Sequence, residues 1–189
     1  MNHPETILRT LDRHLVEPAR LILYGRAALA LGFPDPHEDF LATLDVDAIL
    51  PEVDMHAIEA DESFWNAVQL TNEELEPSGL YLTHLFTDSQ VILQPGWLEH
   101  LVPLELAKLR LLSIFRPSVS DLVLTKMMRI DPQDRDDIQF LLSQTKPTPT
   151  QVESWLLAAR VPDVQEIREA FDENAKWLRA TLKERRDSV

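Results

Sequence analysis

Asp45 and Asp47, which are separated by one residue in an apolar run, have the types and spacing best suited to chemistry in this chain. In a strand the side chains at these two positions point to one face, ~7 Å apart, while Val46 packs behind them. Two neighbouring carboxylates repel each other unless a cation lies between them, and hard oxygen ligands with room for water suit Mg²⁺. The pattern therefore predicts a magnesium site, and a solvated strand end is the plain alternative.

The elements before these aspartates favour phosphate binding beside the metal. Residues 21–24 form an apolar run that predicts a buried strand, Gly25 predicts a tight turn, and RAALALG predicts a helix. The N-terminus of a helix presents unpaired backbone N–H groups and a positive dipole end to an anion. We therefore expect Gly25 and Arg26 to contact phosphate, with the alternative that the Arg26 stem covers apolar surface.

Three segments resemble one family when they are taken in order: LILYGRAALALG, ATLDVDAIL and RPSVSDLVLTKMMRIDPQDRDDIQFLL. Together they are similar to the nucleotidyltransferase-like proteins related to the AbiEii toxins of bacterial abortive-infection systems. The resemblance implies an α/β (α+β) fold whose nucleotidyltransferase-like core, residues 1–116, has a small mixed sheet flanked by helices. Residues 117–189 would form a C-terminal helical part packed on that core.

The resemblance also implies roles for individual residues. Asp45 and Asp47 would hold Mg²⁺ that bridges the triphosphate of an NTP. Thr43, which matches the first position of the T-x-D-x-D motif, would help to bind the nucleotide. Lys126 matches a helical lysine that would contact phosphate. The acidic pair that follows would be Asp134 and Asp137, with Asp137 orienting Lys126 or the acceptor.

Three positions depart from the family pattern. Arg26 stands where the family has a small residue after the turn glycine, and Leu41 stands where the family has arginine. A third metal carboxylate, expected on a strand after the aspartate pair, has only Asp88 or Glu105 as candidates. We predict Asp88 as the third ligand, although its sequence context is that of a turn.

The second half of the motif has ordinary alternatives. Lys126 could extend its amine to solvent or pair with Asp121 or Asp134. The acidic run at residues 134–137 stands near the start of a predicted helix, where the helix dipole favours carboxylates whatever the function.

The charge is strongly uneven. The net charge is −14, and residues 27–107 contain 16 carboxylates but no Lys or Arg. Binding of nucleic acid depends on cations that neutralise phosphates, so direct nucleic-acid binding is disfavoured. An acidic surface of this kind is instead suited to a basic protein partner, such as an antitoxin.

Composition bounds the remaining classes. With 189 residues and 44% hydrophobic residues, the chain is expected to form one domain, or one domain with an appendage. No apolar run is long enough to span a membrane, and the N-terminal residues lack the pattern of a signal peptide. The absence of Cys excludes disulfides and cysteine nucleophiles, and the six His residues show no zinc-ligand spacing. We expect a cytoplasmic protein.

Hydrophobic periodicity predicts the other elements. Helices are expected over residues 5–17, with Ile7, Leu8, Leu11 and Leu15 on one apolar stripe, and over residues 54–69, with a break at residues 61–63. Further helices are expected from residue 118 to the end, where Ser118 with Asp121 and Thr148 with Gln151 form capping-box patterns. The runs LYLTHLF and QVIL, separated by turn residues, predict a hairpin or two strands of one sheet, and a further strand is expected within residues 104–116.

The leading hypothesis is Mg²⁺-dependent transfer of a nucleotidyl group from an NTP to an unknown acceptor, RNA or protein, by an enzyme that could act as a toxin. The alternative is a catalytically degenerate module of the same fold that binds a protein or a nucleotide. The sequence leaves open whether the protein is an enzyme.

Overall fold

The computed structural model describes residues 2–187, and these fall into two compact units. The first, the sheet unit, comprises the chain up to Asp88 together with Leu101–Pro117. The second, the helical unit, comprises Ser89–His100 together with the chain from Ser118 onward. Each unit is described by itself.

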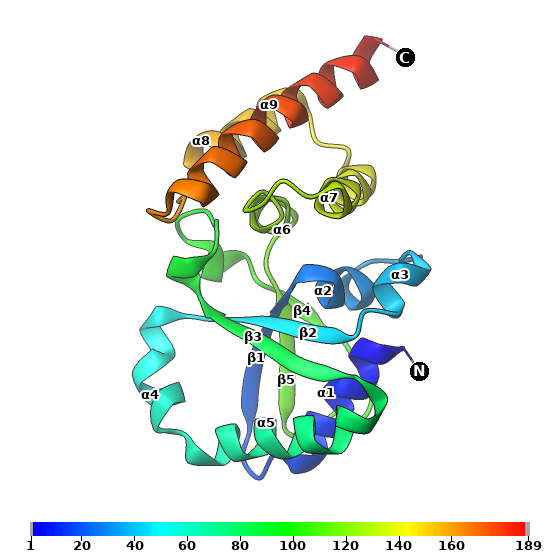
Figure 1. Ribbon diagram of the computed structural model, residues 1–189, viewed down its shortest axis with the longest axis vertical. Coiled ribbons are helices and arrows are strands. Elements are labelled where there is room, and N and C mark those ends of the chain that lie inside the picture. Colours follow the sequence, from blue (N-terminus) through cyan, green and yellow to red (C-terminus); the bar gives the residue numbers. More distant parts are fainter. Residues whose placement is uncertain (1, 188–189) are drawn as a thin grey trace. The chain divides into compact units, whose positions relative to one another are not determined.

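The sheet unit contains five strands and five helices among the residues described (Figure 1). Its strands run in the order β3-β2-β1-β5-β4, and the pairs β1/β5 and β2/β3 are parallel while β1/β2 and β4/β5 are antiparallel. The predicted mixed sheet flanked by helices is therefore confirmed. The elements are α1 (His3–His14), β1 (Ala19–Tyr24), α2 (Gly25–Gly32), α3 (Glu38–Leu41), β2 (Asp45–Leu50), α4 (Met55–Ala60), α5 (Glu62–Leu75), β3 (Tyr81–Thr87), β4 (Val102–Leu104) and β5 (Leu112–Arg116).

Apolar periodicity explains how these elements form the core. The predicted apolar stripe of the first helix is buried, and α1 packs beside α5 (Figure 1). The central strand β1 buries three consecutive side chains, as expected for a strand with neighbours on both edges and cover on both faces. In β2 the burial pattern begins as an alternation, which leaves Asp45 and Asp47 partly exposed and Val46 buried.

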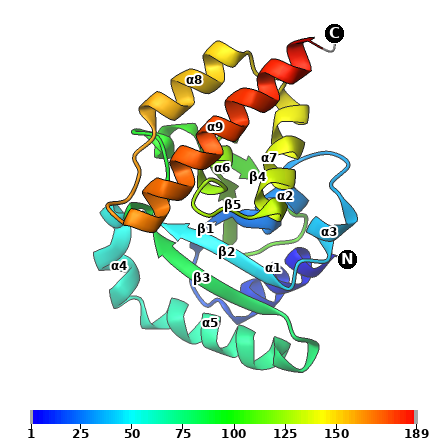
Figure 2. The same cartoon turned by 45° about the horizontal axis from the view of Figure 1, so that its top comes forward.

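The helical unit is built from α6 (Val119–Thr125), α7 (Pro132–Thr145), α8 (Pro149–Ala158) and α9 (Gln165–Asp187). Figure 2 shows α8 and α9 lying side by side. The predicted N-terminal signals are confirmed, because the Ser118 side chain accepts the backbone N–H of Asp121 and Thr148 forms a complete capping box with Gln151.

The predicted hairpin is wrong. LYLTHLF forms β3, but it pairs in parallel with β2, and QVIL is no strand. Instead, Leu93 forms an isolated bridge with Arg160, and Val91, Ile92 and Leu93 are buried in the helical unit. Short apolar runs predict burial but not the partner that covers them.

The break predicted at residues 61–63 is confirmed. Helix α4 ends at Ala60, and Asp61 caps α5 by accepting the backbone N–H of Phe64. Within residues 2–187, none of the helices has the length and apolar character that a membrane-spanning segment needs.

The Asp12 side chain on α1 accepts hydrogen bonds from backbone N–H groups at the start of β5 and so links these two elements. Its carboxylate is 5% exposed and accepts the backbone N–H groups of Arg110, Leu111 and Leu112. Burial alone would raise the pKa of Asp12, but these hydrogen bonds and the Arg110 charge bring it below its usual value. The ionised carboxylate therefore stabilises the native state above the pKa of the unfolded chain, and this stabilisation is lost as pH falls through the folded-state pKa.

We expect Asp12→Asn to lower the free energy of unfolding by ~1–3 kcal/mol at pH 7, because a buried acceptor of three N–H groups is weakened. Urea denaturation at pH 7 and at successively lower pH measures this. The difference between wild type and variant should shrink as the pH is lowered, and a difference independent of pH would contradict the assignment.

Candidate active site

Asp45 and Asp47 lie on β2 with their side chains on one partly exposed face, as predicted. Together with His84 they offer ligand atoms that all lie within 4.8 Å of one another. Such a group of two carboxylates and one imidazole has the donors and the spacing of a cation site.

Two threonines hold these carboxylates. Thr43 Oγ1 donates to Asp45 Oδ1 at 2.8 Å, and Thr83 Oγ1 donates to Asp47 Oδ1 at 3.2 Å. The structure thus shows Thr43, which was predicted next to the nucleotide, in contact with one of the two aspartates. Through these hydrogen bonds the two threonines fix the rotamers of the carboxylates. Their role is therefore to position the aspartates, and they would not themselves bind a cation.

His84 reaches the aspartates through an irregularity in β3. The pairing of β2 with β3 shifts after Asp47 and Thr83, so that Ala48 is opposite Leu85 and His84 is the extra residue of a β-bulge. Its φ is +32°, in the left-handed region, and its Nδ1 lies 3.0 Å from Asp47 Oδ1.

Sequence reasoning missed His84, because ligand spacing along the chain says nothing about a residue 37 positions beyond Asp47 on a neighbouring strand. The family pattern did point to the correct strand, because it implies a third ligand on a strand after the aspartate pair. The family pattern implies a carboxylate at that place, so the histidine in LYLTHLF was not predicted as a ligand.

The aspartate pair is electrostatically costly. Burial raises the pKa of Asp47, the neighbouring Asp45 charge raises it further, and hydrogen bonds from His84 and Thr83 offset part of this effect. A carboxylate whose charged form is disfavoured in this way is stabilised by an added cation.

The turn after β1 brings the N-terminus of α2 to the same place. Gly25 has φ +65°, and a Cβ on it would lie 3.2 Å from Asp47 Oδ2. This distance confirms the predicted arrangement of the helix N-terminus beside the aspartates. No side chain caps α2, which suits backbone N–H groups that bind an anion. The guanidinium of Arg26 lies over the Phe40 ring, 5.4 Å from its centroid, which agrees with the alternative in which Arg26 covers apolar surface.

Gly25→Ala is expected to lower the free energy of unfolding by ~1–2 kcal/mol, the cost of a left-handed backbone with a Cβ. The new methyl group would also press on the Asp47 carboxylate and weaken cation binding. Gly79→Ala is the matched control, because Gly79 has φ +66° with nothing within 4 Å of an added Cβ. Thermal melts should fall for both variants, while calorimetric titration with Mg²⁺ or Mn²⁺ should change only for Gly25→Ala. Equal binding by both would contradict the close contact.

The predicted third carboxylate lies outside this group. Asp88 stands in a short 3₁₀ turn, Asp88–Gln90, and accepts the backbone N–H of Glu52 at 2.8 Å. Glu105 follows β4, which is separated from β2 by β1 and β5. In the part of the chain that the structure describes, the third potential ligand beside Asp45 and Asp47 is His84.

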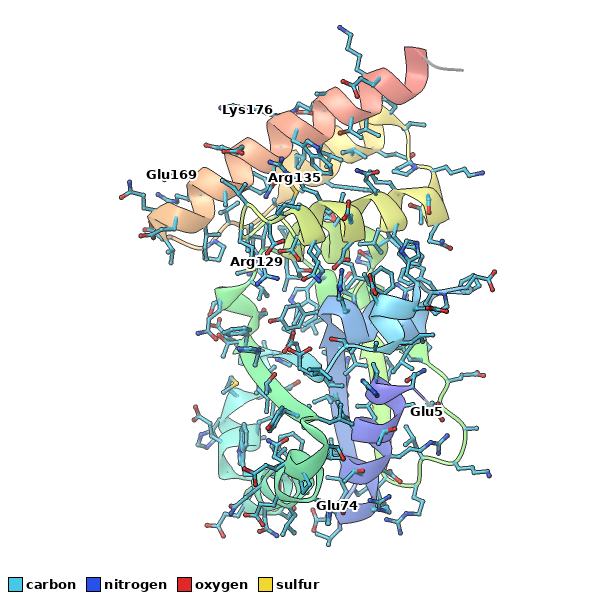
Figure 3. All side chains as sticks on the ribbon, turned by 45° about the vertical axis from the view of Figure 1, so that its right-hand side comes forward. Glu5, Glu74, Arg129, Arg135, Glu169 and Lys176 are labelled. Atoms are coloured by element: carbon cyan, nitrogen blue, oxygen red, sulfur yellow. The ribbon has the colours of Figure 1, made fainter. Side chains whose placement is uncertain are left out.

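Lys126, Asp134 and Asp137 meet in the helical unit. Lys126 Nζ donates to Asp137 Oδ2 at 2.6 Å and to Asp134 Oδ1 at 3.1 Å, and Arg129 pairs with the other oxygen of Asp134. The three paired groups are nearly buried, with side-chain exposures of 11% for Lys126, 5% for Asp134 and 0% for Asp137. Asn174 donates to the backbone carbonyls of Met127 and Arg129. The Arg135 guanidinium donates to the side-chain oxygen of Asn174, and both arginines are labelled in Figure 3. The ion pair between Lys126 and Asp134, which the sequence offered as an alternative to a phosphate contact by Lys126, is therefore present.

Comparison with known proteins agrees with the geometry of the sheet unit. Residues 6–146 match a family described as nucleotidyltransferase of unknown function (DUF6036), which covers well over half of the chain. A search of curated proteins and a search of solved structures each found no significant match. With its aspartate pair beside the turn at Gly25, the chain belongs to this family of nucleotidyltransferases of unknown function.

Proposed function

We propose that this protein transfers a nucleotidyl group from an NTP to an acceptor in a Mg²⁺-dependent reaction. The observation that carries the proposal is the pair Asp45 and Asp47 on one face of β2, with the N-terminus of α2 against Asp47, in a chain of a nucleotidyltransferase family. The finer relationship to AbiEii-type toxins, and a toxic activity, are part of the proposal.

The donor set fits a divalent cation. The two carboxylates are held by Thr43 and Thr83 within 4.8 Å of each other, and the charge of Asp45 adds to the burial that raises the pKa of Asp47. Asp45 and Asp47 would hold the ion. A divalent cation held there would polarise the α-phosphate and neutralise the charge of the departing pyrophosphate.

The chain itself supplies binding and orientation. The backbone N–H groups at the start of α2 would bind a phosphate oxygen, since no side chain caps this helix and its dipole favours an anion there. Arg26 is the last basic residue before Lys108, so it would provide side-chain charge at this turn. A phosphate contact by Lys126, with Asp137 orienting it, belongs to the proposal on the strength of the motif alone.

The proposed acceptor is RNA or a protein. The cation-free stretch at residues 27–107 favours a protein acceptor, because nucleic-acid backbones are repelled by its 16 carboxylates. The same stretch is suited to a basic partner protein. The cytoplasm, where NTPs and Mg²⁺ are abundant, is the location that goes with this activity.

The direct test is incubation of the wild-type protein with each of the four α-labelled NTPs, with Mg²⁺ or with a chelator, in the presence of total RNA or of cell protein. Transfer of label to one acceptor class together with pyrophosphate release, both abolished by the chelator, is the expected result. No transfer with any NTP would contradict the proposal.

Arg26 at the family's small-residue position favours a second candidate, a catalytically degenerate module that binds nucleotide or protein. A rise in melting temperature with NTP and Mg²⁺ but without turnover would favour this candidate, because a ligand that binds only the native state stabilises it.

A further inference from the structure

We propose that His84 supplies the third protein ligand of the cation site through Nδ1, and that this imidazole moves the preference of the site from Mg²⁺ toward first-row transition cations such as Mn²⁺. The inference rests on the proposed function for the placement of a divalent cation between Asp45 and Asp47. It goes further by naming the third ligand and the class of metal.

The distances suit two neighbouring ligands of one ion. Two ligands at right angles on an octahedral ion with bonds of ~2.1 Å lie ~3.0 Å apart. His84 Nδ1 and Asp47 Oδ1 are 3.0 Å apart, and the ligand atoms of all three residues lie within 4.8 Å of one another. A cation could therefore be bound with little movement of these side chains. Binding through Nδ1 requires the neutral tautomer with its proton on Nε2, so the cation would replace the hydrogen bond between His84 and Asp47.

The bulge is what gives His84 this position. In a regular strand the residue after Thr83 would point to the opposite face of the sheet from Asp47. The register shift after Asp47 and the left-handed backbone of His84 instead turn its ring to the aspartates. The ring stacks on Phe86 with 5.5 Å between centroids and 11° between planes, which holds its orientation.

The exposure of the imidazole suits a site that also takes a substrate. The His84 side chain is 59% exposed and that of Asp47 is 21% exposed. Three protein ligands on one side of the ion would leave its other positions open to water and to phosphate oxygens.

The chemistry of the donors sets the preference. Mg²⁺ favours oxygen ligands and binds weakly to imidazole nitrogen, whereas transition cations accept imidazole readily. A carboxylate at position 84 would restore an all-oxygen site. His84→Asp is therefore the informative substitution, and His84→Asn is its uncharged counterpart. Both replacements tolerate positive φ, so the bulge should be kept.

Mn²⁺ is the probe, because it is paramagnetic and can replace Mg²⁺. Pulsed electron paramagnetic resonance of the Mn²⁺-loaded protein should show coupling to a directly bound ¹⁴N nucleus in wild type, and this coupling should be absent in His84→Asp and His84→Asn. His56→Asn, which changes an exposed histidine of α4 in the same unit, is the matched control and should keep the coupling. Competition titrations should show that His84→Asp lowers the ratio of Mn²⁺ to Mg²⁺ affinity several-fold, while melts confirm that each variant is folded.

Each outcome decides the inference. Absent ¹⁴N coupling in wild type, or an affinity ratio that His84→Asp leaves unchanged, would overturn it. Coupling that disappears only in the His84 variants supports the role of His84, whether or not the protein turns over NTP. Absence of NTP turnover would overturn the proposed function instead. Turnover with Mg²⁺ but without ¹⁴N coupling would keep the proposed function and reject the role of His84.

Discussion

Asp45→Asn is expected to reduce nucleotidyl transfer by about two orders of magnitude or more while the fold stays as stable as wild type or becomes more stable. A metal ion contributes several kcal/mol of charge stabilisation in the transition state, and each ~1.4 kcal/mol is a factor of ten in rate. The gain in stability follows because Asp45 and Asp47 repel each other when no cation is bound, and an amide at position 45 removes that repulsion. The amide oxygen can still accept the hydrogen bond from Thr43.

The measurement pairs NTP turnover with Mg²⁺ against thermal melts without metal. Glu59→Gln is the matched control, since it removes the same charge from an exposed position of the same unit and should change neither turnover nor the melt. A melting temperature lowered by several degrees in Asp45→Asn, with turnover unaffected, would show instead that Asp45 is a structural residue.

Lys126→Met is expected to lower the free energy of unfolding by about 3–5 kcal/mol. Removing one partner of a buried ion pair takes away much of what compensates the other charge, and the Asp137 side chain that Lys126 contacts is fully buried. The change in packing is small, because the methionine side chain is similar in length to the lysine stem. Urea denaturation of the full chain measures the loss.

Two variants sharpen the interpretation. Lys176→Met changes an exposed lysine of α9, labelled in Figure 3, and should cost little. In the double variant Lys126→Met with Asp137→Leu, much of the stability should return, because an apolar pair of similar volume often replaces a buried ion pair without loss. A Lys126→Met protein as stable as Lys176→Met would mean that the ion pairs contribute little to the fold.

The sequence predicts local features of this protein well. The strand that carries Asp45 and Asp47, the glycine turn before α2, and the caps at Ser118 and Thr148 all depend on neighbouring residues, and all are confirmed. Periodicity and capping operate within one or two turns of chain, so a single sequence contains the information that they need.

Features that depend on distant pairing were harder to predict. The QVIL segment is buried as its composition suggests, but its cover comes from residues around Arg160 rather than from a hairpin partner. His84 is the same kind of case, because its position depends on a one-residue shift against β2. A register shift leaves no mark in the composition of a strand, since the pattern of apolar residues on both sides of it stays intact.

Neither unit is a continuous stretch of chain. The central pairing of β1 with β5 joins Ala19 to Leu112, so a chain emerging from the ribosome cannot complete its sheet until residue 116 has been made. By then Ser89–His100 has already been synthesised, and it waits for the helices that follow Ser118. During synthesis the sheet unit can therefore form before the helical unit, but not before its last strand has been made and only while Ser89–His100 still lacks the rest of its own unit. The pairing of β1 with β5 closes a long loop of chain that includes Ser89–His100, and long-range closure of this kind slows folding.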